Sequence, residues 1–189
     1  MTFSETSLPG CYTIKTRPHL DLRGTFVKTY LQSGFREQGL ESKFAETFYT
    51  VSEENVLRGM HLQLPPADAV KLVSCAMGSI IDVLFDLRRG SPTYGRFAAF
   101  ELSADLSVYI QRGVAHGFYV TRGPAMVVYQ STAEHAPKLD SGIAWDSIGF
   151  PWPNQDPIIS DRDARLPSFN EFDSPFHYLQ HEGQLIYGR

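Results

Sequence analysis

Apolar and polar residues alternate in short runs along most of the first 132 residues, and Gly, Pro, Asn and Asp separate the runs. In "LSVYIQ" (106–111), for example, Leu106, Val108 and Ile110 share one face and the residues between them share the other. This alternation predicts β-strands at residues 25–30, 48–52, 56–64, 71–78, 79–87, 96–102, 106–111, 116–121 and 125–132. Closely spaced strands without helices between them indicate an antiparallel sandwich or barrel, and a jelly roll would accommodate them around a ligand cavity.

The remaining segments predict little regular structure. "SGFREQG" (33–39) is the one helical pattern before the C-terminal third. "GFPWPNQDPIISDRDARLPSF" (149–169) is too rich in Pro and Asp for a regular strand or a long helix, and its Trp and Ile residues predict an ordered lid packed over the barrel. The last residues, 177–189, give only weak helical signals. We therefore predict one all-β, cupin-like jelly-roll domain over residues 1–189, with a core at about 10–168 and a C-terminal extension at 169–189.

Composition narrows the function classes. The chain has 189 residues, 42% of them hydrophobic, which suits a single domain with a substantial core. Its net charge of −4 argues against nucleic-acid binding but allows a local basic patch that holds a phosphorylated small molecule. No apolar run approaches the roughly 18 residues of a membrane span, and "MTFSETSLPGC" lacks the features of a signal peptide. With only Cys11 and Cys75, a cytoplasmic protein with reduced thiols is predicted.

The stretch "NVLRGMHLQ" (55–63) places polar residues inside a strand-like run. Strand alternation predicts that Gly59, His61 and Gln63 share a face, as do Lys71, Val73 and Cys75 on the next strand. The loop "PPADAV" between the two strands would let them pair antiparallel, which would bring His61 and Lys71 into the same barrel mouth. Each residue alone could be structural, but an interior Lys usually has a partner or a task.

Metal binding is the first chemistry to weigh, because cupin-type barrels often use two or three histidines and a carboxylate. Here Gln63 occupies the second position of the usual H-x-H pair, which leaves His61 and His116 of "RGVAHGF" (112–118). Two imidazoles and an amide are a poor ligand set for a transition metal. We therefore predict no metal and no cofactor.

Acid–base chemistry beside a ketone is the alternative. His61 could remove a proton from a carbon next to a carbonyl, while the ammonium of Lys71 holds the developing enolate oxygen. Such a base needs a carboxylate to orient it, and "SDRD" (160–163) offers Asp161 or Asp163. Tyr129 could supply a proton from the other side of the cavity, or could be an ordinary barrel tyrosine.

The chain resembles the dTDP-4-dehydrorhamnose 3,5-epimerase family over about residues 10–168. The matching segments are "DLRGTF" (21–26), "NVLRGMHLQ" (55–63), "KLVSCAMGSIIDVLFDLRRGSPTYGRF" (71–97), "ELSAD" (101–105), "RGVAHGF" (112–118), "GIAWD" (142–146) and "PIISDRDARLP" (157–167). Any one of them is only suggestive, but together and in order they are specific.

The resemblance implies a metal-free, homodimeric jelly roll that inverts C3, C5 or both of a 4-keto-6-deoxy sugar on a nucleoside diphosphate, in deoxysugar or surface-polysaccharide biosynthesis. By their matching positions, His61 is the expected base, Asp163 its carboxylate partner, Tyr129 the acid and Lys71 the stabiliser of the C4 enolate oxygen. Further substrate-binding positions implied by the resemblance are Arg58, Arg23, Phe26, Glu46, Gln63, His116 and Trp145. Arg58 and Arg23 would grip phosphate, and the Arg23 segment would reach the neighbouring subunit's site.

The sequence departs from the family pattern around the nucleotide. Lys28 stands where the family commonly has a glutamate, and residues 46–48 read Glu-Thr-Phe in place of Gln-Asp-Asn. The nucleotide base and the sugar therefore stay open. Other possibilities are a nucleotide-sugar 3,4-ketoisomerase of the same barrel class, a sugar-nucleotide binding module without turnover, and a metal-dependent cupin oxygenase.

Overall fold

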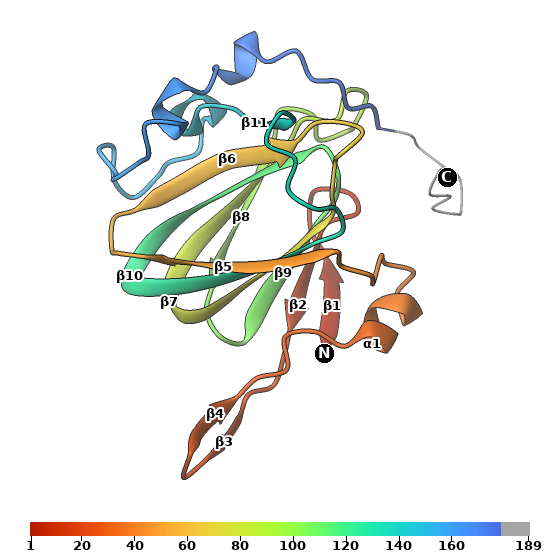
Figure 1. Cartoon of the computed structure of the whole chain (residues 1–189), viewed down its shortest axis with the longest axis vertical. Coiled ribbons are helices and arrows are strands. Elements are labelled where there is room, and N and C mark those ends of the chain that lie inside the picture. The colour runs from red at the N-terminus through yellow and green to blue at the C-terminus, as the bar shows by residue number, and fades with distance from the viewer. Residues whose placement is uncertain (179–189) are drawn as a thin grey trace.

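Two long antiparallel strands, β7 (Lys71–Asp86) and β10 (Val114–Ser131), run through the centre of the computed structural model, which describes residues 1–178 (Figure 1). β7 bends at Gly78, whose φ is 81°. A Cβ there would lie 2.5 Å from the carbonyl oxygen of Arg122, so the close approach of the two strands requires glycine. Because both strands bend, each contributes one half to each of two facing layers.

The first layer contains the N-terminal half of β7 and the C-terminal half of β10. Its strands follow the order β1-β2-β9-β7-β10-β5. The added strands are β1 (Thr2–Glu5), β2 (Tyr12–Lys15), β9 (Leu106–Ile110) and β5 (Glu46–Ser52). The second layer has the order β8-β7-β10-β6-β11 and uses the other halves of the two long strands. It adds β8 (Phe97–Leu102), β6 (Leu57–Gln63) and β11 (Asp140–Gly142).

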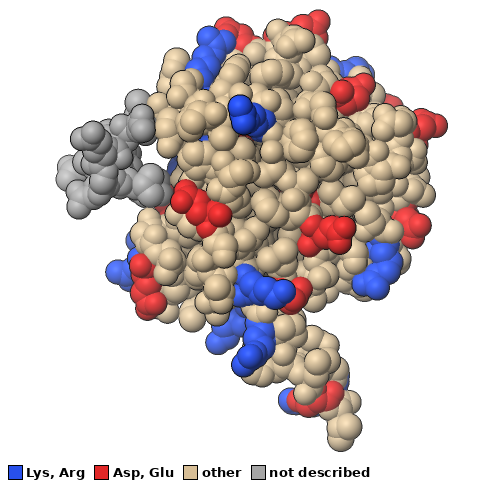
Figure 2. Space-filling model, turned by 180° about the vertical axis from the view of Figure 1, so that it is seen from behind, with Lys and Arg blue, Asp and Glu red and all other residues tan. Residues whose placement is uncertain are grey.

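A hairpin arm, β3 (His19–Asp21) and β4 (Gly24–Phe26), projects away from the two layers (Figure 1). The opposite view shows the same projection and a body surface on which basic and acidic side chains are interspersed (Figure 2). The helical elements are short: α1 (Gln32–Glu37), η1 (Trp145–Ile148), η2 (Asp163–Arg165) and η3 (Phe169–Glu171). The predicted all-β jelly roll with a few short helices is confirmed.

Three buried clusters hold the elements together. The first lies between the layers and includes Val108, Ile110 and Val127. Alternation in β9 also buries Tyr109 on its other face, in a second cluster with Phe35 of α1. The third cluster joins the outer face of the second layer to the C-terminal segment through Trp152 and Phe176. Segment 149–169 is thus ordered, as predicted, and packs over the outer face of the second layer, while its Arg162 reaches the wall of the cavity described below.

Several predicted elements differ from the structure. Residues 71–78 and 79–87 belong to one strand, and so do 116–121 and 125–132, because both long strands bend without ending. Of the predicted strand 25–30, only Thr25 and Phe26 lie in a strand, which is β4 (Gly24–Phe26). The predicted direct pairing of the strands around His61 and Lys71 is wrong: β10 lies between β6 and β7. β1, β2, β3 and β11 were not predicted.

The single-domain division stays a prediction, and the weak helical signal at 177–189 lies almost entirely outside the described residues. Among the described residues, no helix combines the length and apolarity that crossing a membrane requires. Cys11 and Cys75 are buried free thiols.

Candidate active site

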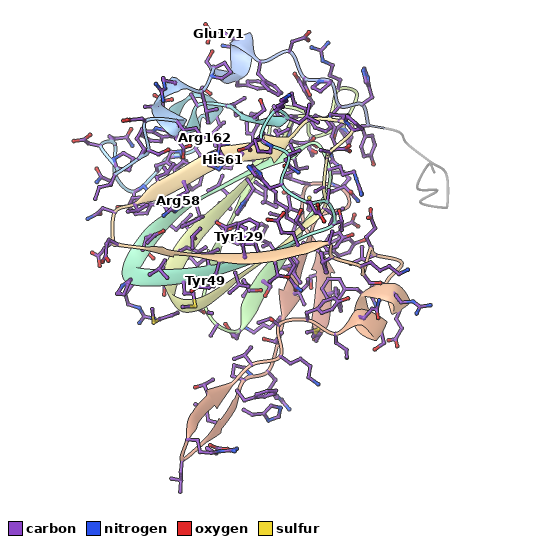
Figure 3. The ribbon with its side chains drawn as sticks, viewed as in Figure 1. Tyr49, Arg58, His61, Tyr129, Arg162 and Glu171 are labelled. Carbon is purple, nitrogen blue, oxygen red and sulfur yellow. The ribbon has the colours of Figure 1, made fainter. Side chains whose placement is uncertain are left out.

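A cavity of about 400 Å³ opens between the two layers. Its walls come from β5, β6, β7, β10 and β11, from the loop that follows β10 and from the segment that carries Arg162. Figure 3 shows Arg58, His61, Tyr129 and Arg162 gathered between β5 and β6. The cavity-lining residues are Glu46, Phe48, Thr50, Arg58, His61, Gln63, Lys71, His116, Phe118, Tyr129, Ser131, Ala133, His135, Asp140 and Arg162.

His61 is held by a buried carboxylate. Its Nε2 lies 2.7 Å from Oδ1 of Asp163, while Oδ2 of Asp163 accepts the backbone N–H of Gly59 at 3.1 Å. The hydrogen bond from His61 is a main reason why the pKa of Asp163 is lowered although burial opposes this. Burial lowers the pKa of His61, with Asp163 acting in the opposite direction. A neutral imidazole that donates Nε2–H to the carboxylate keeps a basic lone pair on Nδ1.

A β-bulge explains why Arg58 and His61 both line the cavity. His61 is opposite His116, whereas Arg58 is opposite Phe118, so β6 carries one extra residue in this interval. Gly59 within the bulge has a φ of 139°, and a Cβ on it would lie 2.4 Å from Cα of Gly117. The prediction that Gly59 simply shares the face of His61 is therefore wrong: the bulge breaks the alternation and turns Arg58 toward the cavity.

Lys71 begins β7 at the cavity wall. Burial lowers its pKa to about 8, with Asp140 raising it and Arg162 lowering it. Arg162 in turn donates to Asp140 at 2.9 Å. Below pH 8 the Lys71 side chain is therefore mainly an ammonium, and the guanidinium of Arg162 nearby is paired with Asp140.

Tyr129 is a buried phenol on β10 and is 8% exposed. Burial raises its pKa above the usual value, and Thr50 and Arg58 act in the opposite direction. The phenol is therefore protonated at neutral pH and can donate a proton.

His116 forms a second buried pair, with its Nε2 2.6 Å from Oδ2 of Asp82. Both side chains are almost completely buried, and Oδ1 of Asp82 has no hydrogen-bond partner among the described residues. His116 thus lines the cavity, as predicted, in a fixed orientation.

The predicted substrate-binding residues divide into two groups. Arg58 lines the cavity and donates through Nε to Ser52 at 2.9 Å. Glu46 also lines it and accepts the backbone N–H of His135. Gln63 reaches the wall, but its amide binds the backbone of Ala67 at 2.8 Å and of Ala136 at 2.7 Å, so it ties two loops together.

The other three lie elsewhere. Trp145 packs against Trp152 in the outer cluster and is absent from the cavity walls of the described structure. A direct substrate contact by Trp145 therefore has no geometric support here. Arg23 and Phe26 lie on the hairpin arm, and Arg23 pairs only locally with Asp21 in the described chain.

Sequence reasoning missed several cavity residues. In the sequence, Arg162 stands between the two candidate carboxylates, Asp161 and Asp163. Asp163 is buried and Asp161 is exposed. Phe48 appears in the sequence only as a departure from the family pattern, and Thr50, Ser131 and His135 gave no chemical signal. Residues 1–178 contain no group of three or more His, Cys, Asp or Glu side chains placed to hold a metal ion.

This arrangement can remove a proton from a carbon beside a carbonyl, stabilise the resulting oxyanion and return a proton. It defines an enzyme of the proton-transfer isomerase class built on a jelly roll. Comparison with known proteins makes the assignment specific. The family model described as dTDP-4-dehydrorhamnose 3,5-epimerase matches residues 5–171.

Individual relatives agree. A dTDP-4-dehydrorhamnose 3,5-epimerase from Methanothermobacter thermautotrophicus is 39% identical over 176 residues, which covers 89% of this chain and 95% of the relative. A crystal structure of dTDP-6-deoxy-D-glucose-3,5-epimerase from Legionella pneumophila, in complex with dTDP-4-keto-L-rhamnose, matches with a TM-score of 0.89 and 28% identity over 95% of this chain and 99% of that one. A 3'-monoepimerase from Streptomyces bikiniensis, in complex with dTDP-quinovose, matches with a TM-score of 0.81 and 29% identity over 86% and 85%.

The chain belongs to the dTDP-4-dehydrorhamnose 3,5-epimerase family. The predicted family and the predicted isomerase class are confirmed.

Proposed function

We propose that the protein inverts C3, C5 or both of a 4-keto-6-deoxy sugar carried on a nucleoside diphosphate. The observation that carries the proposal is the convergence of His61, Lys71 and Tyr129 from three strands on one cavity, with His61 paired to a buried carboxylate. The names of the relatives support the substrate class, since they describe both 3,5-epimerases and a 3'-monoepimerase.

The reaction is a proton transfer without net redox change. Nδ1 of His61 takes the proton from the carbon beside the C4 carbonyl, and the electron pair moves to the C4 oxygen. The ammonium of Lys71 stabilises that enolate oxygen. When the enolate collapses, the Tyr129 hydroxyl gives its proton to the opposite face of the carbon, and Asp163 stabilises the imidazolium of His61 until both groups exchange protons with solvent.

We propose that cationic side chains at the cavity bind the phosphates of the substrate. Arg58 and Arg162 both line it, and a guanidinium matches phosphate oxygens in a bidentate manner. We leave the nucleotide base open, because Glu46 and Phe48 stand at positions where the sequence departs from the family pattern.

Incubation with a dTDP-linked 4-keto-6-deoxy sugar in deuterated water tests the proposal. The native protein should place deuterium at C3, C5 or both, and His61→Asn should abolish this exchange while nucleotide affinity changes little. His177→Asn, an exposed histidine that does not line the cavity, is the matched control and should behave like the native protein. Absence of deuterium from both carbons with the native protein would refute the proposed reaction.

We further propose a homodimer in which the arm of one copy completes the site of the other. Leu20, Leu22 and Phe26 of the arm are 79%, 107% and 61% exposed, which is unusual for apolar residues unless they meet a partner. Arg23 at the tip of the same arm would then reach the partner's phosphate subsite.

Mixing two variants tests this exchange. Unfolding and refolding His61→Asn together with Arg23→Ala gives mixed dimers in which one of the two sites receives both native residues. Activity should then recover to about a quarter of the native level, given random pairing. If Arg23 served its own chain, the mixture would show no more activity than the Arg23→Ala portion alone, and a monomer by light scattering would also contradict the proposal.

A further inference from the structure

Phe48 lies directly against the proposed acid. The register of β5 and β10 places Phe48 opposite Tyr129. Their rings stack at a centroid distance of 4.7 Å and an interplanar angle of 10°. Both rings line the cavity, but Phe48 is 41% exposed, whereas Tyr129 is almost buried.

The other neighbour of Tyr129 is rigid. The ring of His116 meets that of Tyr129 at a centroid distance of 6.0 Å and an angle of 70°, and the buried carboxylate of Asp82 holds His116 in place. The ring of Tyr129 is therefore flanked by two aromatic neighbours, a fixed histidine and a half-exposed phenylalanine, while the side chain of Thr50 lies beside its hydroxyl. Of the two aromatic contacts, only that of Phe48 opens toward solvent.

An acid that protonates a short-lived enolate must be in place when the enolate forms. A small displacement of a reacting group costs a large part of its rate advantage. If the phenol turns away, the enolate persists, the imidazolium of His61 exchanges its proton with solvent and returns a solvent proton to the original face, and the sugar is released with its configuration unchanged. The orientation of Tyr129 thus sets how often a deprotonation ends in inversion.

We propose that Phe48 is a positioning residue that holds the phenol of Tyr129 over the sugar ring, and that it thereby determines the fraction of deprotonations that become inversions. This inference rests on the proposed roles of His61 and Tyr129. Phe48 makes no contact with the reacting atoms in this proposal. It affects only how the enolate divides between inversion and return to the original configuration after proton removal.

The test measures two rates in deuterated water with a dTDP-linked 4-keto-6-deoxy sugar. One is the appearance of deuterium in sugar of unchanged configuration, and the other is the formation of inverted sugar. In Phe48→Asn the sum of the two rates should stay within about twofold of native, because His61 and Lys71 are intact, while the inverted fraction should fall about tenfold. Phe48→Tyr keeps an aromatic ring and should restore the native fraction.

Tyr49→Leu is the matched control, because Tyr49 neighbours Phe48 on β5, points to the other face of the strand and is 65% exposed. It should leave the inverted fraction unchanged. A native inverted fraction in a folded Phe48→Asn protein overturns the inference, and so does an equal loss of exchange and inversion. Failure of the proposed reaction itself gives a different result, namely no exchange by the native protein or full exchange by His61→Asn.

Discussion

Replacing Asp163 by Asn should slow proton removal while the fold is kept. The carboxylate is 3% exposed and lies 2.7 Å from Nε2 of His61. A hydrogen bond to a charged group contributes about 1.5–3 kcal/mol, and each 1.36 kcal/mol is a factor of ten, so kcat should fall by about 10- to 150-fold. An amide that donates to Nε2 would also move the ring proton to Nδ1 and block the basic nitrogen, which favours the upper end of this range.

The pH dependence of the rate distinguishes loss of the Asp163–His61 hydrogen bond from simple unfolding of the variant. Asp163 raises the pKa of His61 against the lowering effects of burial, Arg162 and Lys71. Without the carboxylate the pKa of His61 should fall further. The low-pH limb of the rate profile, where protonation of His61 stops the reaction, should then move to lower pH while the plateau drops.

The effect of the substitution on the free energy of unfolding depends on the pKa of Asp163. The pKa of Asp163 is lowered in the folded protein, so its contribution is present above pH 3.8 and is lost as the pH falls through the folded value. The free energy of unfolding of native and Asp163→Asn protein should therefore converge in acid.

Deuterium exchange from pH 4.5 to 8 measures the rate profile, and urea unfolding measures stability. Asp161→Asn is the control, since this carboxylate is exposed on the same segment and should give native rates. A folded Asp163→Asn protein with kcat within threefold of native would refute the reasoning. A lowered plateau with an unmoved acidic limb would do the same.

Three further predictions concern the cavity and its bulge. Because burial lowers the pKa of Lys71 to about 8, exchange should decline as the pH rises through about 8, and Lys71→Met should lack this limb and be about 100-fold slower in pH–rate measurements. Arg58→Ala should raise KM about tenfold with kcat within about twofold in steady-state kinetics, because a phosphate contact acts on ground and transition states alike. Gly59→Ala should cost about 2–4 kcal/mol of unfolding free energy in urea, since its Cβ would lie 2.4 Å from a backbone atom of Gly117, whereas Gly34→Ala in α1 meets only an ordinary contact and serves as control.

The sequence pattern was sufficient to predict most central strands, because apolar and polar residues alternate within each strand independently of its neighbours. Leu106–Ile110 illustrates this, with one face in the inter-layer core and the other against α1. Strand pairing is a different matter, since it depends on residues far apart in the chain. The short loop between β6 and β7 suggested a hairpin, yet β10 inserts between them and makes both sets of hydrogen bonds.

The predicted chemistry depended on residue types that are costly to bury without a task, which pointed to His61 and Lys71. The same reasoning left Asp161 and Asp163 open, and only the family resemblance favoured Asp163. Other cavity residues gave no such signal. Phe48 stands out in the sequence only as a departure from the family pattern, and the role proposed for it comes from a register that sets it opposite Tyr129. Trp145 differs from these residues: it lies inside a matching segment, but its side chain packs against the outer cluster and does not line the cavity.

The two-layer topology gives a physical reason for inversion. Tyr129 lies on the C-terminal half of β10, in the first layer, and Lys71 lies in the same layer on β7, opposite Ser131. His61 lies on β6, in the second layer, where it is opposite His116 on the N-terminal half of β10. A sugar ring inserted between the layers would therefore have the proposed base on one wall and the proposed acid on the other. In the proposed mechanism, proton removal and return through opposite faces follow from the bend of β10, because a flat strand would have left both groups in one sheet.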